Sequence, residues 1–405
     1  MQTHLSEQAR ALPRGEEAEA ILRSCVHCGF CNATCPTYQL LGDELDGPRG
    51  RIYLMKQVME GHTPTASTLE HLDRCLTCRN CETTCPSGVQ YHNLLDIGRE
   101  VVEQQVPRTL GDRMLRAGVR AVVPHAGLFK VLVDTGSLLR PVLPGFFKAK
   151  LPRQVHPAGV RPALRHARRM LMLEGCVQPG LSPNTNAAAA RVLDRLQVSV
   201  EPVRQAGCCG AVDYHLNAQQ AGLDRARHNI DAWWPAIEAG AEAIVQTASG
   251  CGAFIKDYGH LLEHDPQYAD KARRVSELAK DLVEVLRDAP LEHLGVHAEP
   301  SLAFHCPCTL QHAQKLGGAV ESVLTRLGFH LTAVPDAHLC CGSAGTYSLT
   351  QPTLSRQLRD NKLNALESGR PQVIATANIG CQAHLDSAGR TPVRHWIELV
   401  DQAMA

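Results

Sequence analysis

Apolar positions in the first quarter of the chain recur at helical spacing. In "GRIYLMKQVMEG" (50–61), Ile52, Met55 and Met59 lie three and four residues apart, and "TLEHLDRC" (68–75) repeats this spacing with two leucines. Side chains at this spacing share one face of a helix, and we expect the methionines to fill a core rather than to ligate a metal. The pattern predicts a helical N-terminal region.

The second half of the chain shows a different pattern, in which short apolar runs alternate with helical stretches. Four runs have the length and composition of buried strands, and each ends close to a cysteine: "RMLMLEG", "EAIVQTAS", "SLAFHC" and "QVIATANIG". The helical stretches "NAAAARVLDRL" and "GGAVESVLTRL" follow the first and third runs. This alternation predicts α/β architecture, in which loops at the carboxyl ends of parallel strands carry functional side chains.

Composition narrows the class of protein. No apolar run of the 405 residues approaches the roughly 20 that span a bilayer, and the start, "MQTHLSEQARAL", lacks the apolar core of a secretory signal. We therefore expect a cytoplasmic protein, in which clustered cysteines serve metal or redox chemistry more often than disulfides. The formal net charge is zero, which argues against nucleic acid as a partner.

Eight of the 17 cysteines form two runs with the spacing C-x2-C-x2-C-x3-C-P. In bacterial ferredoxins such a run supplies three thiolates to one [4Fe–4S] cluster, and its fourth cysteine ligates the other cluster. A zinc site is the alternative, but zinc ligands usually come as two separated pairs. We predict two neighbouring [4Fe–4S] clusters with crossed ligands. The first set is Cys25, Cys28, Cys31 and Cys85, and the second is Cys35, Cys75, Cys78 and Cys81.

Eight further cysteines form a longer internal repeat, at an offset of 132 residues for three pairs and 130 for the fourth. Each half contains a Cys-Cys-Gly doublet. The glycine permits a tight loop, which suggests that the two thiols point toward a common site. Zinc, a further iron–sulfur centre, a redox dithiol and inert buried thiols all remain open. The two candidate sites are Cys176, Cys208, Cys209 and Cys251, and Cys308, Cys340, Cys341 and Cys381.

Three residues lie beside these loops. Cys306 has no counterpart in the first half, and we expect it to lie outside the sites. His305 and His384 are adjacent to the cysteine loops, and His384 is a candidate outside ligand.

A basic stretch joins the two halves. Residues 107–153 contain nine Arg or Lys against Asp112 and Asp134, interleaved with apolar pieces and broken by prolines. Such a stretch can lie on an anionic membrane or dock a partner, or it can be an ordinary linker packed on both domains.

The double run, "GPRGRIYLMK" (47–56), the twin CCG doublets and "FHCPCTLQHAQKL" (304–316) resemble the iron–sulfur subunits of bacterial glycolate oxidase over nearly the whole chain. Subunits of anaerobic glycerol-3-phosphate dehydrogenase, a lactate-utilisation protein and heterodisulfide reductase share the layout. The heterodisulfide reductase type ends each repeat in C-x-x-C, whereas this chain has Phe254 and His384 at those positions. One ligand of that noncubane cluster is therefore missing in each repeat.

The resemblance implies an oxidoreductase subunit that is inactive alone. It would accept electrons from a flavin-bearing subunit, which holds FAD and oxidises glycolate to glyoxylate, and would pass them toward a quinone at the inner face of the cell membrane. No G-x-G-x-x-G follows a predicted strand, and we assign no catalytic residue to this chain. A thiol–disulfide redox subunit, or the equivalent subunit of a lactate or glycerol-3-phosphate dehydrogenase, is the alternative.

These patterns together predict the fold class: an α-helical ferredoxin-like N-terminal domain followed by two repeated α/β cysteine-rich (CCG) domains that face each other pseudo-symmetrically. The expected boundaries are 1–106 for the helical domain, 107–165 for the basic connector, and 166–295 and 296–405 for the two repeats.

Overall fold

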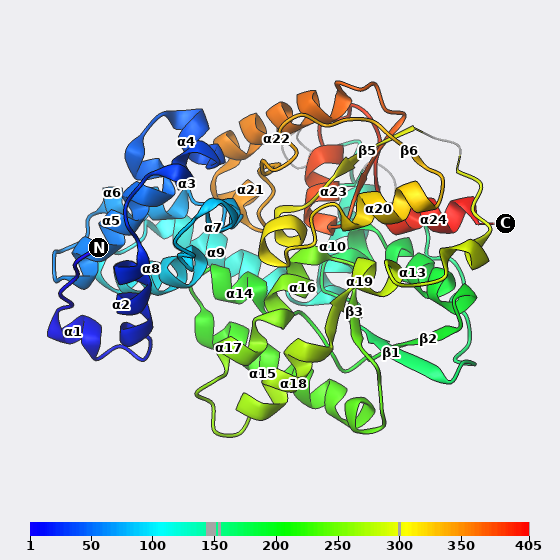
Figure 1. Cartoon of the computed structure of the whole chain (residues 1–405), viewed down its shortest axis with the longest axis horizontal. Coiled ribbons are helices and arrows are strands. Elements are labelled where there is room, and N and C mark those ends of the chain that lie inside the picture. Colours follow the sequence, from blue (N-terminus) through cyan, green and yellow to red (C-terminus); the bar gives the residue numbers. More distant parts are fainter. Residues whose placement is uncertain (143–150, 153–154, 299–300, 405) are drawn as a thin grey trace. The chain divides into compact units, whose positions relative to one another are not determined.

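The computed structural model describes residues 1–142, 151–152, 155–298 and 301–404. The chain divides into two compact units. Unit 1 comprises residues 1–116 and 338–358, and unit 2 comprises residues 117–337 and 359–405. Figure 1 labels the elements along the chain. Within the described ranges, no helix has both the length and the apolar character needed to cross a bilayer.

Unit 1 is helical and has a single apolar core. The helices α5 (Pro48–Met59), α6 (Ala66–Asp73) and α8 (Tyr91–Gln105) pack on one another, and the residues predicted from helical spacing, Met55 and Met59 among them, are buried between them. The helical N-terminal region is therefore confirmed. The other elements of this unit are α1 (Glu7–Arg10), α2 (Gly15–Ser24), α3 (Phe30–Ala33), α4 (Pro36–Leu41), η1 (Glu44–Asp46), α7 (Asn80–Thr84) and α21 (Tyr347–Thr350).

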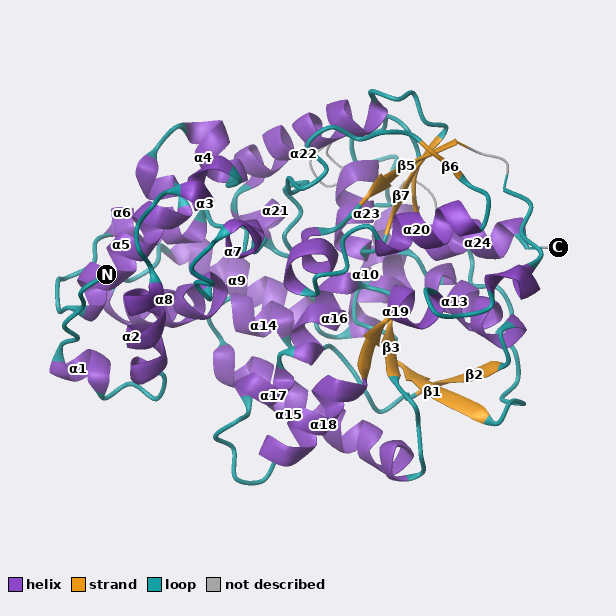
Figure 2. Ribbon diagram, in the orientation of Figure 1, coloured by secondary structure: helices purple, strands orange, loops and turns teal. Residues whose placement is uncertain are grey.

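Unit 2 contains two parallel four-stranded sheets of the same topology, drawn as orange arrows in Figure 2. Their strand orders are β2-β1-β3-β4 and β6-β5-β7-β8. The strands are β1 (Arg168–Met172), β2 (Val198–Pro202), β3 (Ile244–Gln246), β4 (Ala279–Asp281), β5 (Ser301–His305), β6 (His330–Leu331), β7 (Val373–Thr376) and β8 (Val393–His395).

The predicted apolar runs are β1, β3, β5 and β7, the two central strands of each sheet, and the α/β fold class is confirmed. The edge strands β2, β4, β6 and β8 were not predicted. Each has at most five residues, and an edge strand buries less apolar surface than a central one, so its sequence carries a weaker signal.

Helices surround both sheets. α13 (Asn184–Arg195) and α20 (Ala319–Arg326) are the helical stretches predicted after β1 and β5. The remaining elements of unit 2 are α10 (Ala126–Leu138), α12 (Gln178–Leu181), α14 (Ala211–His215), α15 (Gln219–Glu238), α16 (Ser249–Lys256), α17 (Tyr258–Leu261), α18 (Ala269–Leu278), α19 (Leu282–Leu286), η2 (Leu291–Leu294), η3 (Thr309–Ala313), α23 (Ile379–Asp386) and α24 (Trp396–Ala403). α9 (Leu110–Val122) and α22 (Pro352–Glu367) have residues in both units.

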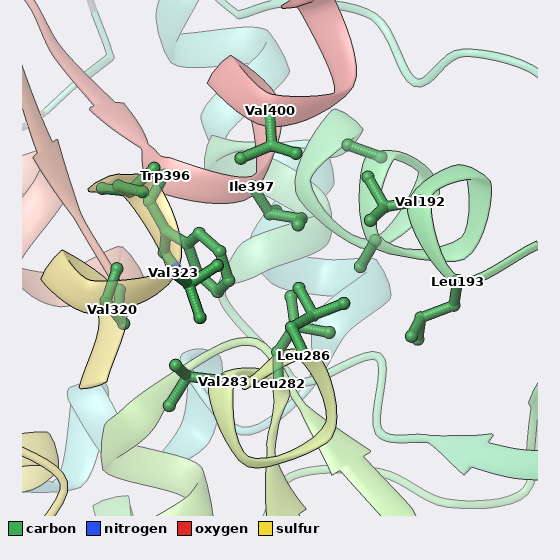
Figure 3. Close-up of a cluster of buried hydrophobic side chains, with 14 of the residues drawn as sticks. Val192, Leu193, Leu282, Val283, Leu286, Val320, Val323, Trp396, Ile397 and Val400 are labelled. Atoms are coloured by element: carbon green, nitrogen blue, oxygen red, sulfur yellow. The ribbon is translucent and has the colours of Figure 1, made fainter. Parts of the chain in front are cut away.

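One hydrophobic cluster joins the two repeats within unit 2. Figure 3 shows Leu286 of α19, Val323 of α20 and Ile397 of α24 in this cluster. α13 packs on α24, and α19 packs on α20. Since α13 and α20 follow the first strand of their sheets, and α19 and α24 follow the last, each contact pairs a first helix of one repeat with a last helix of the other. This reciprocity is the signature of a pseudo-two-fold pair.

Two features differ from the sequence-based picture. Segment 338–358, which lies in the second repeat by sequence, belongs to unit 1. The basic connector begins with two regular 13-residue helices, α9 and α10, before residues 143–150 and 153–154, which lie outside the described residues.

Candidate metal centres

Cysteines from both runs line one cavity of unit 1, to which Cys81 also contributes. Cys25, Cys28 and Cys31 lie in and just after the loop that joins α2 to α3, and Cys85 follows α7. The cavity encloses about 430 Å³, including its opening to solvent, and Cys28 is the exposed member. We call this cavity site 1.

A second cavity of unit 1 holds the complementary four cysteines. Cys75 and Cys78 lie between α6 and α7, Cys81 lies in the first turn of α7, and Cys35 precedes α4. This cavity encloses about 310 Å³, and we call it site 2. Pro48, Cys81 and Tyr91 line both cavities, so the two sites are neighbours. The grouping is crossed, because the fourth cysteine of each run lies with the first three of the other.

The two cysteine loops have the same backbone conformation. His27 and Gly29 in the first loop, and Thr77 and Arg79 in the second, all have left-handed φ angles between 51° and 86°. The Thr77 N–H donates to Cys75 Sγ at 3.5 Å, and the His27 N–H bonds Cys25 in the same way. Turns of this kind aim successive N–H groups at one point, which suits an anionic iron–sulfur cluster.

The electrostatics of both sites fit thiolates that bind iron. Burial raises the pKa of the Cys31 thiol to about 11, and burial together with neighbouring sulfurs raises the pKa of Cys35 and Cys81. Several buried thiols that would repel one another as thiolates need a compensating positive charge, and iron supplies it in a cluster. None of these eight cysteines forms a disulfide. Donor type, number and burial therefore fit one [4Fe–4S] cluster at each site.

The cysteines of the first repeat also converge. Hydrogen bonds link Cys176 to Cys208, Cys208 to Cys209, and Cys209 to Cys251. Cys176 follows β1, the doublet lies between β2 and α14, and Cys251 lies in the first turn of α16 after β3. The carboxyl ends of three parallel strands thus bring the four thiols together. We call this group site 3.

Buried polar side chains hold the doublet loop in place. Asn229 Nδ2 donates to the Cys208 carbonyl at 2.9 Å, and Tyr258 Oη donates to the Cys209 carbonyl at 2.6 Å. Gly210 has φ +100°, and a Cβ atom there would lie 2.5 Å from the Gly222 carbonyl oxygen. Glycine is required at this position because both the left-handed backbone and the close contact exclude a side chain.

Site 3 favours one thiolate among its thiols. Hydrogen bonds from Cys176 and Cys209 stabilise the charged form of Cys208 and lower its pKa to about 3, and Arg225 contributes. The same bonds raise the pKa of Cys176 and of Cys209, because each donates its proton to a neighbouring sulfur. The group can therefore bind a metal ion or hold a reactive thiolate.

The second repeat is divided between the units. Cys340 and Cys341 belong to unit 1, whereas Cys308 and Cys381 belong to unit 2, so the convergence of these four thiols stays a prediction. Its doublet loop resembles that of site 3: Gly342 has φ +83°, and a Cβ atom there would lie 2.6 Å from the Ser355 carbonyl oxygen.

The three residues noted beside the loops are also located. Cys306 lies in the apolar core that joins the repeats, which supports its exclusion from the ligand sets. His305 is buried at the end of β5, and His384 is half-buried on α23.

Sequence reasoning missed the residues that support the sites. Arg51 lines site 2, Tyr91 lies between sites 1 and 2, and Asn229 and Tyr258 hold site 3. Arg51 lies inside "GPRGRIYLMK" at a position where helical spacing gives no reason for a buried charge. The available signal was weak: Arg51 is a charged residue next to the apolar face of a predicted helix.

These sites and this fold define a class of protein: an iron–sulfur protein with a dicluster domain and paired cysteine-rich α/β repeats. Family models agree. A "4Fe-4S dicluster domain" matches residues 21–89, and a "Cysteine-rich domain" (CCG) matches residues 170–256 and again 302–386.

Similar proteins narrow the class. The chain is 71% identical to the glycolate oxidase iron-sulfur subunit of Escherichia coli (strain K12), over 100% of this chain and 99% of that protein. It is 29% identical to a probable glycolate oxidase iron-sulfur subunit of Bacillus subtilis (strain 168), over 90% and 88% of the two chains. It is 27% identical to lactate utilization protein A of Anoxybacillus flavithermus, over 49% and 82%. The chain belongs to the family of glycolate oxidase iron-sulfur subunits.

The crossed grouping predicts which site each fourth cysteine serves. Cys85→Ser should damage the cluster of Cys25, Cys28 and Cys31, and iron should fall from about eight toward about four per chain. Iron and sulfide analysis with electron paramagnetic resonance of the anaerobic protein measures this. Cys35→Ser is the matched control, expected to damage site 2 instead. Selective loss of site 2 in Cys85→Ser would show that each run binds its own cluster.

Site 3 is predicted to bind a metal. The anaerobic chain should then contain metal beyond the two clusters, with a sulfur shell at about 2.3 Å if the ion is zinc. Cys209→Ser should lose this metal, while Cys306→Ala, in the apolar core, should keep it. Elemental analysis and X-ray absorption measure both. A wild-type chain that contains no such metal and forms a Cys176–Cys208 disulfide on mild oxidation would instead support thiol redox chemistry.

Proposed function

We propose that the chain is the electron-transfer subunit of a glycolate oxidase complex. In this proposal it accepts electrons from a flavin-bearing subunit that oxidises glycolate to glyoxylate, and passes them toward a quinone. A [4Fe–4S] cluster takes up and releases one electron at a time. The residues of this chain bind two such clusters side by side and exclude solvent from most of their surface.

The adjacency of sites 1 and 2 is the observation that carries the proposal. The two cavities share Pro48, Cys81 and Tyr91 as lining, so a cluster in one lies directly beside a cluster in the other. Neighbouring clusters suit the passage of electrons, whereas a structural role needs only one. The E. coli relative is named as a subunit, which supports oxidation of the substrate by a different chain.

The division of labour is testable with purified components. The cluster-loaded chain should show no glycolate-dependent dye reduction by itself, and its visible absorption should bleach on glycolate addition only when the flavin-bearing subunit is present. Stopped-flow absorption under anaerobic conditions measures this. Glycolate-dependent bleaching of the flavin-free chain alone would refute the proposal, and so would clusters that stay oxidised beside a fully reduced flavin partner.

We further propose that α10 lies on the membrane surface. Leu128, Val131 and Leu132 are exposed on one face of this helix, and Val131 is 60% exposed. From residue 135 to residue 153 the sequence contains four Arg or Lys and no acidic residue. An apolar helical face followed by a basic segment suits an anionic lipid surface.

Two of the three basic residues of α9, Arg116 and Arg120, are not available for this role. Arg116 bonds Asp112 at 3.0 Å and Asp73 at 3.3 Å, and Arg120 bonds Asp213 at 2.9 Å. Because these ion pairs stabilise the fold around α9, reversing the charges would disturb folding as well as docking. The apolar face of α10 offers a cleaner test.

The triple variant Leu128→Gln, Val131→Gln and Leu132→Gln should bind vesicles of phosphatidylethanolamine and phosphatidylglycerol about tenfold or more weakly, since each exposed side chain contributes about 1 kcal/mol when it leaves water. Sedimentation with vesicles measures this. Leu41→Gln with Tyr53→Gln, two exposed apolar side chains of unit 1, is the matched control. Unchanged vesicle binding together with weakened assembly with the flavin-bearing subunit would assign α10 to the partner.

A further inference from the structure

Site 2 lies against a buried positive charge that binding of a cluster does not by itself explain. Arg51 of α5 lines the site 2 cavity, and its side chain is 1% exposed. A guanidinium stays protonated at any physiological pH. Burying it costs desolvation free energy, which the fold offsets only through a complete set of partners.

The partners fix the guanidinium in one position. Its Nε donates to the His71 carbonyl oxygen at 2.7 Å, and both terminal nitrogens donate to Thr37 Oγ1 at 3.2 Å. Nη2 also lies 3.4 Å from Asp46 Oδ1. With the side chain bound at both ends, the positive charge stays beside the cavity instead of moving toward solvent.

The neighbouring carboxylate does not cancel this charge. Asp46 is as deeply buried as Arg51, but it also accepts from Arg74 Nη1 at 2.9 Å and faces His71 Nδ1 at 3.0 Å. One carboxylate thus serves two guanidinium groups. Arg74 also pairs with Glu70, but the Glu70 side chain is 56% exposed and solvent screens its charge. The buried end of the network therefore keeps an excess of positive charge even when His71 is neutral.

The same network reaches the sulfur atoms of site 2. Thr37 Oγ1, which accepts from Arg51 and donates to the Asp46 carbonyl oxygen at 2.8 Å, lies 3.3 Å from Cys35 Sγ. Tyr91 Oη donates to Cys75 Sγ at 3.6 Å. Reduction adds a negative charge to a cluster, and both a nearby cation and hydrogen bonds to sulfur stabilise the reduced form. A fixed charge acts strongly here because little water screens it.

The cations at site 1 are different in kind. Arg49 lines that cavity, but it bonds Glu44 at 2.6 Å, and the two side chains are 35% and 41% exposed. The N-terminal ammonium of Met1 donates to the Cys25 carbonyl at a partly buried position. Solvent screens these groups, and the carboxylate of Glu44 offsets the guanidinium of Arg49.

We propose that Arg51 is a positioning residue that raises the reduction potential of the cluster bound by Cys35, Cys75, Cys78 and Cys81. It does so through its fixed charge, which the network holds beside the cavity. The inference rests on the proposed function only in that a cluster occupies site 2. Asp46 acts in the opposite direction, and Arg74 limits that effect.

The test is a mediated reductive titration of the full chain with dithionite, followed by electron paramagnetic resonance. The signal of site 2 is identified as the one lost in Cys78→Ser. Arg51→Gln should shift the midpoint potential of site 2 to more negative values and leave site 1 nearly unchanged. Asp46→Asn should shift it to more positive values. Arg49→Gln is the matched control, expected to shift neither site appreciably.

The signs of the shifts decide the outcome. A purely structural role would move the potentials of both buried variants in one direction, and that result would overturn the proposal. If Arg51→Gln fails to assemble a cluster, Arg74→Gln replaces it, because Arg74 is partly exposed and its loss leaves Asp46 less compensated. Arg74→Gln should then lower the potential, and a shift of the same sign as Asp46→Asn would refute the inference. A wild-type chain without a cluster at site 2 would instead contradict the proposed function.

Discussion

Sulfur atoms that are distant in sequence must meet within the span of one cluster, and the architecture of unit 1 follows from this constraint. Each run can place only three of its sulfurs around one cluster. The fourth cysteine follows a short helix, α3 or α7, which separates its sulfur from the other three. Neither site is complete without the other run. The helices between the runs therefore have to hold two loops at a fixed separation, and the buried faces of α5, α6 and α8 provide that rigidity.

The chain uses duplicated geometry at two scales, and in both cases the two copies keep the backbone conformation. The left-handed position that Gly29 occupies in the first loop is occupied by Arg79 in the second, where a side chain makes the same φ cost about 1–3 kcal/mol. Gly210 and Gly342, by contrast, are both glycine, because a backbone carbonyl closes the space where Cβ would lie. A repeated loop can thus tolerate the backbone strain of a left-handed φ, but it cannot tolerate a steric overlap of Cβ with a backbone carbonyl.

The sequence predicted the elements that follow from residue spacing and missed the charged residues that are buried by tertiary packing. Apolar runs predicted β1, β3, β5 and β7, because a central strand is a continuous apolar segment. Cysteine intervals indicated which thiols to group, and the ligand sets stay a prediction. The burial of Arg51 and Asp46 has no comparable signal: a charged residue in a helix is normally solvated, and only tertiary packing shows that these two are buried together. The assignment of segment 338–358 to unit 1 was equally invisible, since it depends on contacts between residues more than 200 positions apart.

Those contacts bear on what lies beside site 2. Tyr347 Oη donates to the carbonyl of Arg74, the residue before Cys75, at 3.2 Å, and Asn80 Nδ2 donates to the His338 carbonyl at 3.2 Å. Burial raises the pKa of Tyr347, and Cys75 and Cys340 add to the shift, so its ring lies within electrostatic reach of both a site 2 ligand and the second doublet. The Cys340–Cys341 doublet is therefore held in the same compact unit as the clusters, on the side of site 2. Under the proposed function, a charge that arrives on the cluster at site 2 would therefore act on the Cys340–Cys341 doublet through the interior of unit 1, where little water screens it.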